Sequence, residues 1–317
     1  NRIATSTQYG HNYLLDGSRA GNGVTTGEYL EFVDGGTEAH SSGVGGYDIK
    51  IDNAATRATH SGTVGLTQGL IDAGEQITIS EGGRTVNFKT EKGKSVEQTL
   101  NELETAINDA GLKIDLMREF PPLTDSGAPQ TITLRHKEFG SEHTFQAASN
   151  TAGLVSSVSN KSETITNGTD VSGEINGEEA SGRGQILTGD PGADTVEGIK
   201  IRYTGELAPA GGNAGTVTFS QNSLTFQVGG EANQFSEFSL SSIKVNDLGK
   251  GEANASGFDS LAQVKVMNSE QAQDAIRVID KAIGEVNGKR GAMGAFQKNN
   301  LESNLNYLRI AHENSVS

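Results

Sequence analysis

The C-terminal part of the chain carries a helical pattern that is too long for a compact domain. From Asn268 onward, apolar residues recur at the spacing of an α-helix, and Asn268 or Ser269 can cap its first turn. A helix from Ser269 to Ser317 would contain about 49 residues and would be roughly 73 Å long. A compact domain of this chain cannot shield such a rod. Its apolar side must therefore lie against other long helices, from the same chain or from neighbouring chains.

The apolar residues of this helix form one stripe, which we expect to be its packing core. The stripe consists of Ile276, Ile279, Ile283, Val286, Met293, Phe296, Leu301, Leu305 and Leu308. Four glycines lie in the same segment, and each costs about 1 kcal/mol relative to alanine in a helix. They are Gly284, Gly288, Gly291 and Gly294. They would allow another backbone to approach the helix closely, or they mark a bend. A helix that is simply kinked, without any partner at the glycines, is the alternative.

The rest of the chain is poor in apolar residues and rich in glycine. Of the 317 residues, 33% are hydrophobic and 42 are glycine. Such a composition favours thin β layers, in which only alternate residues need to be buried, over one large core. The length predicts about two domains. Because the chain starts at Asn1 and ends at Ser317 within a helical pattern, we expect a fragment trimmed at both ends.

Charge and cysteine content exclude several classes of function. Lys and Arg number 25 against 40 Asp and Glu, so the net charge is 25 − 40 = −15, which disfavours nucleic acid and anionic lipid as partners. No apolar run approaches the length of a membrane span, and no secretory signal pattern is visible. The absence of cysteine excludes disulfides, thiolate zinc sites and cysteine nucleophiles. It is compatible with a reducing compartment or with export of unfolded chains.

The clearest local signals lie between residues 75 and 112. Alternating residues predict strands at 76–80 and 85–89, joined as a hairpin by 81–84. A helix is expected from Ser95, which forms a capping box with Gln98, to the region of Gly111. Further strands are predicted at 24–33, 47–51, 131–135 and 143–146. The last two, together with the hairpin and the helix, would form a small α+β module.

Residues 166–216 have a different character, because twelve of these 51 residues are glycine. Short strand-like pieces between the glycines, such as 186–187 and 199–203, predict a thin β layer and not a catalytic core. A second hairpin is predicted from strands at 216–220 and 223–228. The alternation continues through Phe238, Leu240 and Ile243.

The residues that could carry chemistry form no recognisable catalytic set. His136, Glu138, Glu142 and His143 could form a metal cluster, but their spacing matches neither HExxH nor HxxEH. Two histidines on neighbouring strands beside solvated glutamates is the favoured interpretation. The segment 190–194 (DPGAD) lacks the pattern of a calcium-binding EF-hand and favours a polar turn. We therefore predict no enzyme activity, no metal and no cofactor.

Both ends and the second half of the chain resemble bacterial flagellins. Residues 1–18 (NRIATSTQYGHNYLLDGS) resemble the family pattern of a helix end, a turn and LLDGS, and residues 275–315 resemble the C-terminal helical region. Residues 223–234 (SLTFQVGGEANQ) resemble the family's β-hairpin. Residues 171–205 resemble a Gly-rich motif of flagellins and related filament proteins, which flagellar cap proteins share. Residues 45–165 match only the general style of the variable outer domains.

The resemblance implies an elongated α+β fold. Residues 1–44 and 206–317 would form an inner domain with the long C-terminal helix and a β-hairpin. Residues 45–165 would form an outer α+β domain, and 166–205 a Gly-rich β motif of the same outer region. The opening and closing segments, around Leu14 and Leu305, would then lie together in one rod.

The function that the resemblance implies is that of an extracellular structural subunit of the flagellar filament. Such subunits assemble with copies of themselves into a helical tube for motility. The stripe would pack mainly within the subunit, whereas the polar face would contact neighbouring copies through Gln297, Asn300, Asn304 and Arg309. The resemblance further implies that a fragment without the terminal polymerisation helices is monomeric. An innate immune receptor is a candidate partner.

Two alternatives stay open. A filament cap or hook–filament junction protein would share the motif at 171–205, although the segment at 292–314 favours flagellin. A flagellin homologue that binds carbohydrate at the cell surface would need aromatic platforms. Aromatic residues make up only 5% of the chain, and tryptophan is absent.

Overall fold

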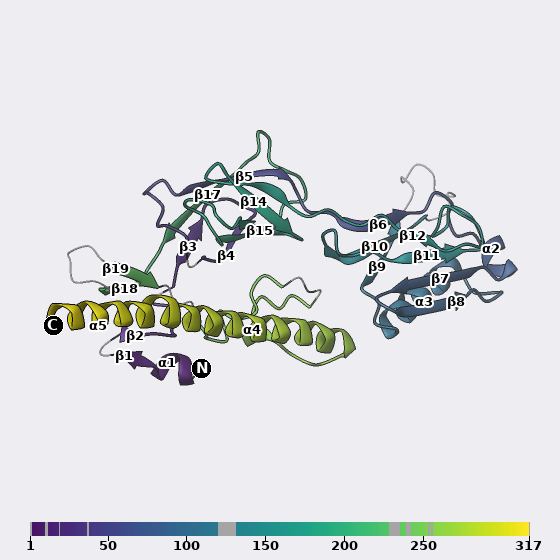
Figure 1. The fold of residues 1–317 in the computed structure, drawn as a ribbon. Coiled ribbons are helices and arrows are strands. Elements are labelled where there is room, and N and C mark those ends of the chain that lie inside the picture. The colour runs from purple at the N-terminus through teal and green to yellow at the C-terminus, as the bar shows by residue number, and fades with distance from the viewer. Residues whose placement is uncertain are drawn as a thin grey trace.

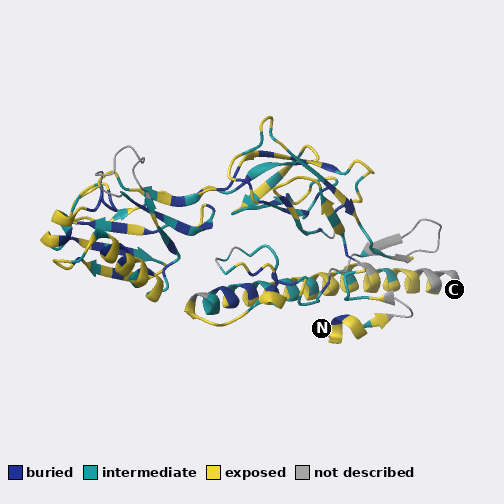
Figure 2. Cartoon of the chain, turned by 180° about the vertical axis from the view of Figure 1, so that it is seen from behind, coloured by how far each residue is buried: buried dark blue, intermediate teal, exposed yellow. Residues whose placement is uncertain are grey.

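The computed structural model describes residues 2–9, 12–18, 20–36, 38–119, 131–227, 235–238, 242–252, 254 and 256–316. These residues form two β-rich bodies and one long helical rod (Figure 1). Buried apolar side chains gather in three separate clusters, one in each body and a small one under the rod (Figure 2). The low apolar content is therefore spread over thin layers, as the composition predicts.

Residues 57–165 form the distal body. A three-stranded sheet has the order β6-β10-β9, and a four-stranded sheet has the order β12-β11-β7-β8. The elements are β6 (Arg57–Ser61), α2 (Gln68–Ala73), β7 (Gln76–Glu81), β8 (Arg84–Lys89), α3 (Val96–Asp109), β9 (Ile114–Glu119), β10 (Thr131–Phe139), β11 (Gln146–Ser149) and β12 (Glu163–Thr164). The buried face of α3 packs on this core through Leu100, Leu103 and Ile107.

The local predictions in the distal body are largely confirmed. Strands β7 and β8 pair as the predicted hairpin, with Ile79 opposite Val86. At the start of α3, the Ser95 hydroxyl accepts from Gln98 N at 3.2 Å, and the side-chain Oε1 of Gln98 accepts from Ser95 N at 3.1 Å. The strand expected at 143–146 begins only at Gln146. Its expected first residues, 143–145, belong to no strand and follow a turn at 141–142, and the Thr144 hydroxyl donates to the carbonyl of Ile165.

An eight-stranded antiparallel sheet forms the proximal body, in the order β3-β17-β5-β13-β14-β15-β16-β4. Its strands are β3 (Asn22–Thr25), β4 (Leu30–Asp34), β5 (Tyr47–Asn53), β13 (Ser172–Ile175), β14 (Glu178–Arg183), β15 (Ile186–Gly189), β16 (Lys200–Tyr203) and β17 (Asn213–Ser220). The two edge strands, β3 and β4, follow one another in the chain, so the sheet curls until its edges approach each other. The enclosed core includes Ile49, Ile201 and Phe219.

This sheet corrects two expectations from the sequence. It crosses the boundaries predicted at 44 and 205, because β3, β4 and β17 pair in the same sheet as β5 and β13–β16. The hairpin predicted from 216–220 and 223–228 is wrong, since β17 pairs with β3 and β5. Strand β18 (Leu224–Gln227) pairs instead with β19 (Phe235–Phe238). Residues 228–234 and Leu240, to which parts of these predictions refer, lie outside the described residues.

The predicted C-terminal rod is present. Helix α4 (Ser269–Phe296) continues through a π-helical turn, η2 (Gln297–Glu302), into α5 (Ser303–Val316), and the three line up as one straight element (Figure 1). Asn268 caps it, because its side chain accepts from Gln271 N at 2.8 Å. No atom lies within 4 Å of a Cβ built on any of the four helix glycines, so the described residues supply no close backbone there. No described helix has the length and apolar character of a membrane span.

The opening segment joins the rod through residues 242–243. It contains α1 (Arg2–Ser6), β1 (Gln8–Tyr9) and β2 (Asn12–Tyr13), and a 3-10 turn, η1 (Leu261–Gln263), precedes the rod. The Leu15 carbonyl accepts from Ile243 N at 3.2 Å, and the carbonyl of Ser242 accepts from Lys289 Nζ at 2.6 Å. Burial lowers the pKa of Lys289. The turn after the opening helix is thus connected to α4 through residues 242–243, and the expected contact of the segments around Leu14 and Leu305 stays a prediction.

Candidate functional site

The apolar stripe of the rod lies at the surface. Ile276 is 58% exposed, Ile283 54% and Leu305 69%, and Ile279, Met293, Leu301 and Leu308 are exposed as well. Val286 and Phe296 are half-buried, and the Phe296 ring stacks on Phe238 with 4.6 Å between the centroids. Figure 2 shows how much of the helix surface stays exposed along the rod.

A different side of α4 is buried within the chain. Its buried apolar residues are Ala275, Val278 and Ala282, of which Ala275 and Val278 pack with Phe258 and Val264. Each lies one residue before a member of the stripe, which is a rotation of about 100° around the helix. The expectation that the stripe packs mainly within the chain therefore does not hold for the described residues. That it packs against other helices stays a prediction.

Of the four residues predicted for contacts between subunits, Gln297 and Arg309 are exposed on the rod. Gln297 donates from Nε2 to Glu302 Oε1 at 3.0 Å, and Arg309 Nε is 3.9 Å from Glu313 Oε1. Asn304 is half-buried, and the side chain of Asn300 lies outside the described residues. Their role between subunits stays a prediction.

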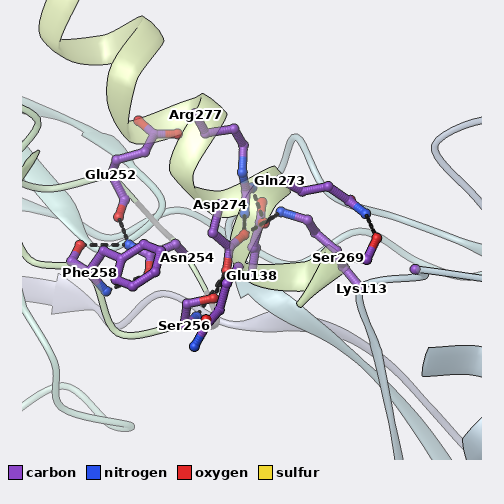
Figure 3. Close-up of polar contacts among 12 residues, drawn as sticks. Lys113, Glu138, Glu252, Asn254, Ser256, Phe258, Ser269, Gln273, Asp274 and Arg277 are labelled. Carbon is purple, nitrogen blue, oxygen red and sulfur yellow. Dashed lines mark hydrogen bonds and ion pairs between the residues drawn. The ribbon is translucent and has the colours of Figure 1, made fainter. Parts of the chain in front are cut away.

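A charged junction connects the start of α4 to the distal body (Figure 3). We use this name for Lys113, Glu138, Asp274 and Arg277. Glu138 and Lys113 come from the distal body, whereas Asp274 and Arg277 lie one turn apart on α4. The two carboxylates are almost completely buried, with side-chain exposures of 3% and 0%.

Asp274 is the centre of the junction. One carboxylate oxygen lies 3.1 Å from Lys113 Nζ and also pairs with Arg277. The other accepts from the backbone N–H and the hydroxyl of Ser256, at 2.9 and 2.6 Å. Burying a charged carboxylate costs free energy, and here four donors compensate that cost.

Glu138 forms ion pairs with the same two cations, Lys113 and Arg277. Lys113 Nζ lies 2.7 Å from its Oε1, and Arg277 pairs with the same oxygen. Next to the junction, Arg84 donates to the Gly111 carbonyl and to Gln273 Oε1 of α4, both at 2.6 Å. Charged hydrogen bonds thus span the contact between two parts of the chain that are far apart in sequence.

Local backbone features place these side chains. Gly111 adopts a φ of +66° after α3, which turns the chain so that Lys113 N donates to Glu81 Oε2 at 3.3 Å. On β10 the pairing with β6 shifts register between Arg135 and Phe139. Within this irregularity, His136 Nδ1 accepts from Glu138 N at 3.0 Å.

The histidine cluster noted in the sequence lies beside the junction. His136 is on β10 and His143 is in the following turn, and their rings stack with 5.0 Å between centroids. His143 Nε2 is 3.2 Å from Glu138 Oε2, and His136 Nε2 is 3.7 Å from Glu81 Oε1. Burial lowers the pKa of His143, while the neighbouring His136 lowers the pKa of Glu81. The sequence suggested that the two histidines lie on neighbouring strands, but only His136 lies on a strand.

Neither candidate metal site is assembled in the described part of the chain. No group of three or more histidine, aspartate or glutamate side chains there could hold a metal ion. Glu142, the fourth residue of the cluster, pairs with Arg183 at 2.9 Å. The segment 190–194 forms a turn, in which Ala193 N donates to the Asp190 carbonyl at 3.1 Å.

The geometry of the junction is suited to holding two parts of the chain together, because its two carboxylates are buried and each is paired with both Lys113 and Arg277. Sequence reasoning missed the junction, because Glu138 and Asp274 are far apart in the chain. The one local signal is an aspartate on α4 directly before the buried Ala275.

Comparison with known proteins gives a distant likeness of fold. No protein-family profile and no curated protein sequence matches the chain. The D2–D3 domains of the flagellar cap protein FliD from Escherichia coli share 15% identity at a TM-score of 0.42, covering 64% of this chain and 99% of that one. FliD from Pseudomonas aeruginosa shares 14% at 0.36, covering 64% and 84%. The Bdellovibrio bacteriovorus cap protein shares 13% at 0.37, covering 61% and 98%.

These three structures are flagellar proteins, the general kind that the sequence predicts. They are cap proteins, however, which the sequence analysis gave as an alternative, and not flagellins.

Proposed function

We propose that the chain is an extracellular structural subunit of the bacterial flagellum and, more specifically, a filament subunit of the flagellin type. The observation that carries this proposal is the uncovered apolar stripe along α4 and α5. Burial of one isoleucine or leucine side chain contributes about 1.5–3 kcal/mol. A row of them on one side of a straight rod favours lateral association with other long helices. The resemblance of residues 275–315 to flagellins identifies those helices as belonging to copies of the same protein.

The mechanism is assembly and not catalysis. Rods pack side by side through the stripe, while the proximal and distal bodies project from the rod and face solvent. The charged junction stabilises the distal body against α4, so each subunit presents one shape to its neighbours. Other copies of the chain are the partners in this proposal. An innate immune receptor as a partner and a monomeric trimmed form stay predictions.

A filament cap protein is the second candidate function. The Gly-rich motif at 171–205, which flagellar cap proteins share, forms strands β13–β16 of the proximal sheet. A cap would close into a small ring at the filament tip, whereas a filament subunit would add along its whole length. Position on the flagellum therefore separates the two candidates.

Charge on the stripe should prevent assembly. In cells that encode this chain, Leu305→Asp should abolish flagellar filaments seen by electron microscopy, because an aspartate cannot be buried unpaired between helices. The purified variant should keep its circular dichroism spectrum, since Leu305 is 69% exposed.

The matched control is Val158→Asp, which places the same charge at an exposed apolar residue of the distal body. It should leave filaments intact. Normal filaments with Leu305→Asp would refute a role of the stripe in assembly. Arg309→Glu tests the polar face in the same assay, and normal filaments would exclude Arg309 from the contacts between subunits.

A further inference from the structure

A cavity of about 240 Å³ lies where the two bodies and the loop before the rod meet. The distal body contributes residues of β6 and β10, and the proximal sheet contributes the turn between β14 and β15 together with part of β16. Residues between 251 and 259 complete the lining. The cavity therefore has walls from three parts of the chain.

Arginines are the distinctive feature of this lining in a chain with a net charge of −15. Arg183 is paired with Glu142 at 2.9 Å, and Arg202 is paired with Glu31 at 2.8 Å. Arg57 also lines the cavity. Among the described residues, no carboxylate pairs with Arg57 and none accepts a hydrogen bond from its guanidinium.

Arg57 stacks on an aromatic ring but lacks a hydrogen-bond acceptor. Its guanidinium carbon lies 4.1 Å from the centroid of the Phe139 ring, which is a favourable cation–π contact, whereas its Nε is buried without an acceptor. Burial, followed by the like charge of Arg135, lowers the pKa of Arg57. A desolvated cation beside another cation is stabilised by an anion.

Each carboxylate of the lining already has a cation as its partner. Glu138 belongs to the charged junction, where two cations hold it. Glu252 lies 3.7 Å from Lys281, and Asp259 lies 3.9 Å from Arg202. The protein thus neutralises its own lining carboxylates and leaves the positive charge of Arg57 for a ligand.

We propose that this cavity is a binding site for a small oxyanion, with Arg57 as the principal ligand. A guanidinium presents parallel N–H groups that match two oxygens of a sulfate, phosphate or carboxylate group. The bound oxyanion would connect the distal body to the proximal sheet. This inference is independent of the function proposed above.

Calorimetric titration of the 317-residue chain tests the site. Sodium sulfate, phosphate and acetate are titrated separately at constant ionic strength, balanced with sodium chloride, so that general screening is equal. Preference for sulfate or phosphate would identify an inorganic oxyanion, and preference for acetate a carboxylate. Arg57→Gln should weaken the binding of the preferred anion by about tenfold or more, because it removes one charged hydrogen-bond pair.

The matched control is Arg118→Gln, which removes an arginine of the distal body that pairs with Glu104 outside the cavity. It should bind like the original chain. Equal affinity of all three proteins, or no binding of any anion beyond chloride, would overturn the proposal. NMR of the arginine Nε–H groups in the unsubstituted chain gives a second measurement that does not depend on a variant. The Arg57 signal should shift on titration with the preferred anion, and its constancy would overturn the site.

Discussion

Asp274→Ala should detach the distal body from the rod. The substitution removes the carboxylate that holds Lys113, Arg277 and Ser256, and it leaves two buried or half-buried cations with fewer partners. Removing one member of a buried ion pair typically costs about 3–5 kcal/mol. We expect the loss in the contact between α4 and the distal body, and not in the core of either body. Hydrogen exchange should therefore accelerate at Ser256 N–H and in the first turns of α4, while the protected core of the distal body is unchanged.

The matched control for this prediction is Glu104→Ala. It removes a carboxylate of the distal body that pairs with Arg118 at 3.1 Å but is 48% exposed. Exposed pairs contribute at most about 1 kcal/mol, so the exchange pattern should stay close to that of the original chain. If Asp274→Ala and Glu104→Ala gave the same exchange rates and the same denaturation midpoint, the junction would have no role in holding the distal body.

Gly182→Ala should disrupt the proximal sheet. A Cβ at this position would lie 1.6 Å from the backbone carbonyl oxygen of Val171, and a backbone atom cannot move aside as the end of a side chain can. Forced overpacking typically costs about 1–3 kcal/mol, and a contact this short should lie at or above the upper end. Denaturant unfolding of the chain should show the loss as a lower midpoint, and the cross-strand signals between β14 and β15 should shift in NMR.

Gly43→Ala is the comparison for this substitution. Nothing lies within 4 Å of a Cβ built there, and Gly43 does not have a positive φ. Its stability should rise slightly, by about 0.4–1 kcal/mol, because alanine restricts the unfolded chain. A Gly182→Ala chain as stable as Gly43→Ala would show that the sheet does not need glycine where its strands approach.

Local patterns predicted most of the elements but not how distant strands pair. The hairpin of β7 and β8, the capping box at Ser95 and the cap at Asn268 depend on neighbours within a few residues, so the sequence contains the whole signal. Strand β17 instead pairs Val217 with Thr25. That contact depends on the packing of segments almost two hundred residues apart. No local periodicity reports it, and the predicted hairpin and domain boundaries were wrong for this reason.

The candidate site shows the same division. Periodicity identified an apolar stripe on the rod, but α4 has two adjacent apolar sides. The pattern could not tell whether Ile276 and Ile279 or Ala275 and Val278 would be buried within the chain. The structure buries the smaller residues, because they allow the loop around Phe258 to approach the helix. The only sequence signal of the charged junction is the aspartate before the buried Ala275, since its partners meet only after the distal body folds.

Immunogold electron microscopy tests the flagellar account most directly. Antibodies raised against the 317-residue chain would be applied to intact cells that encode it, under conditions that preserve flagella. If the chain is a filament subunit, gold should lie along the full length of each filament. Gold at the tip alone would favour the filament cap over the filament subunit. Flagella that bind no gold, on cells shown to produce the protein, would contradict the account.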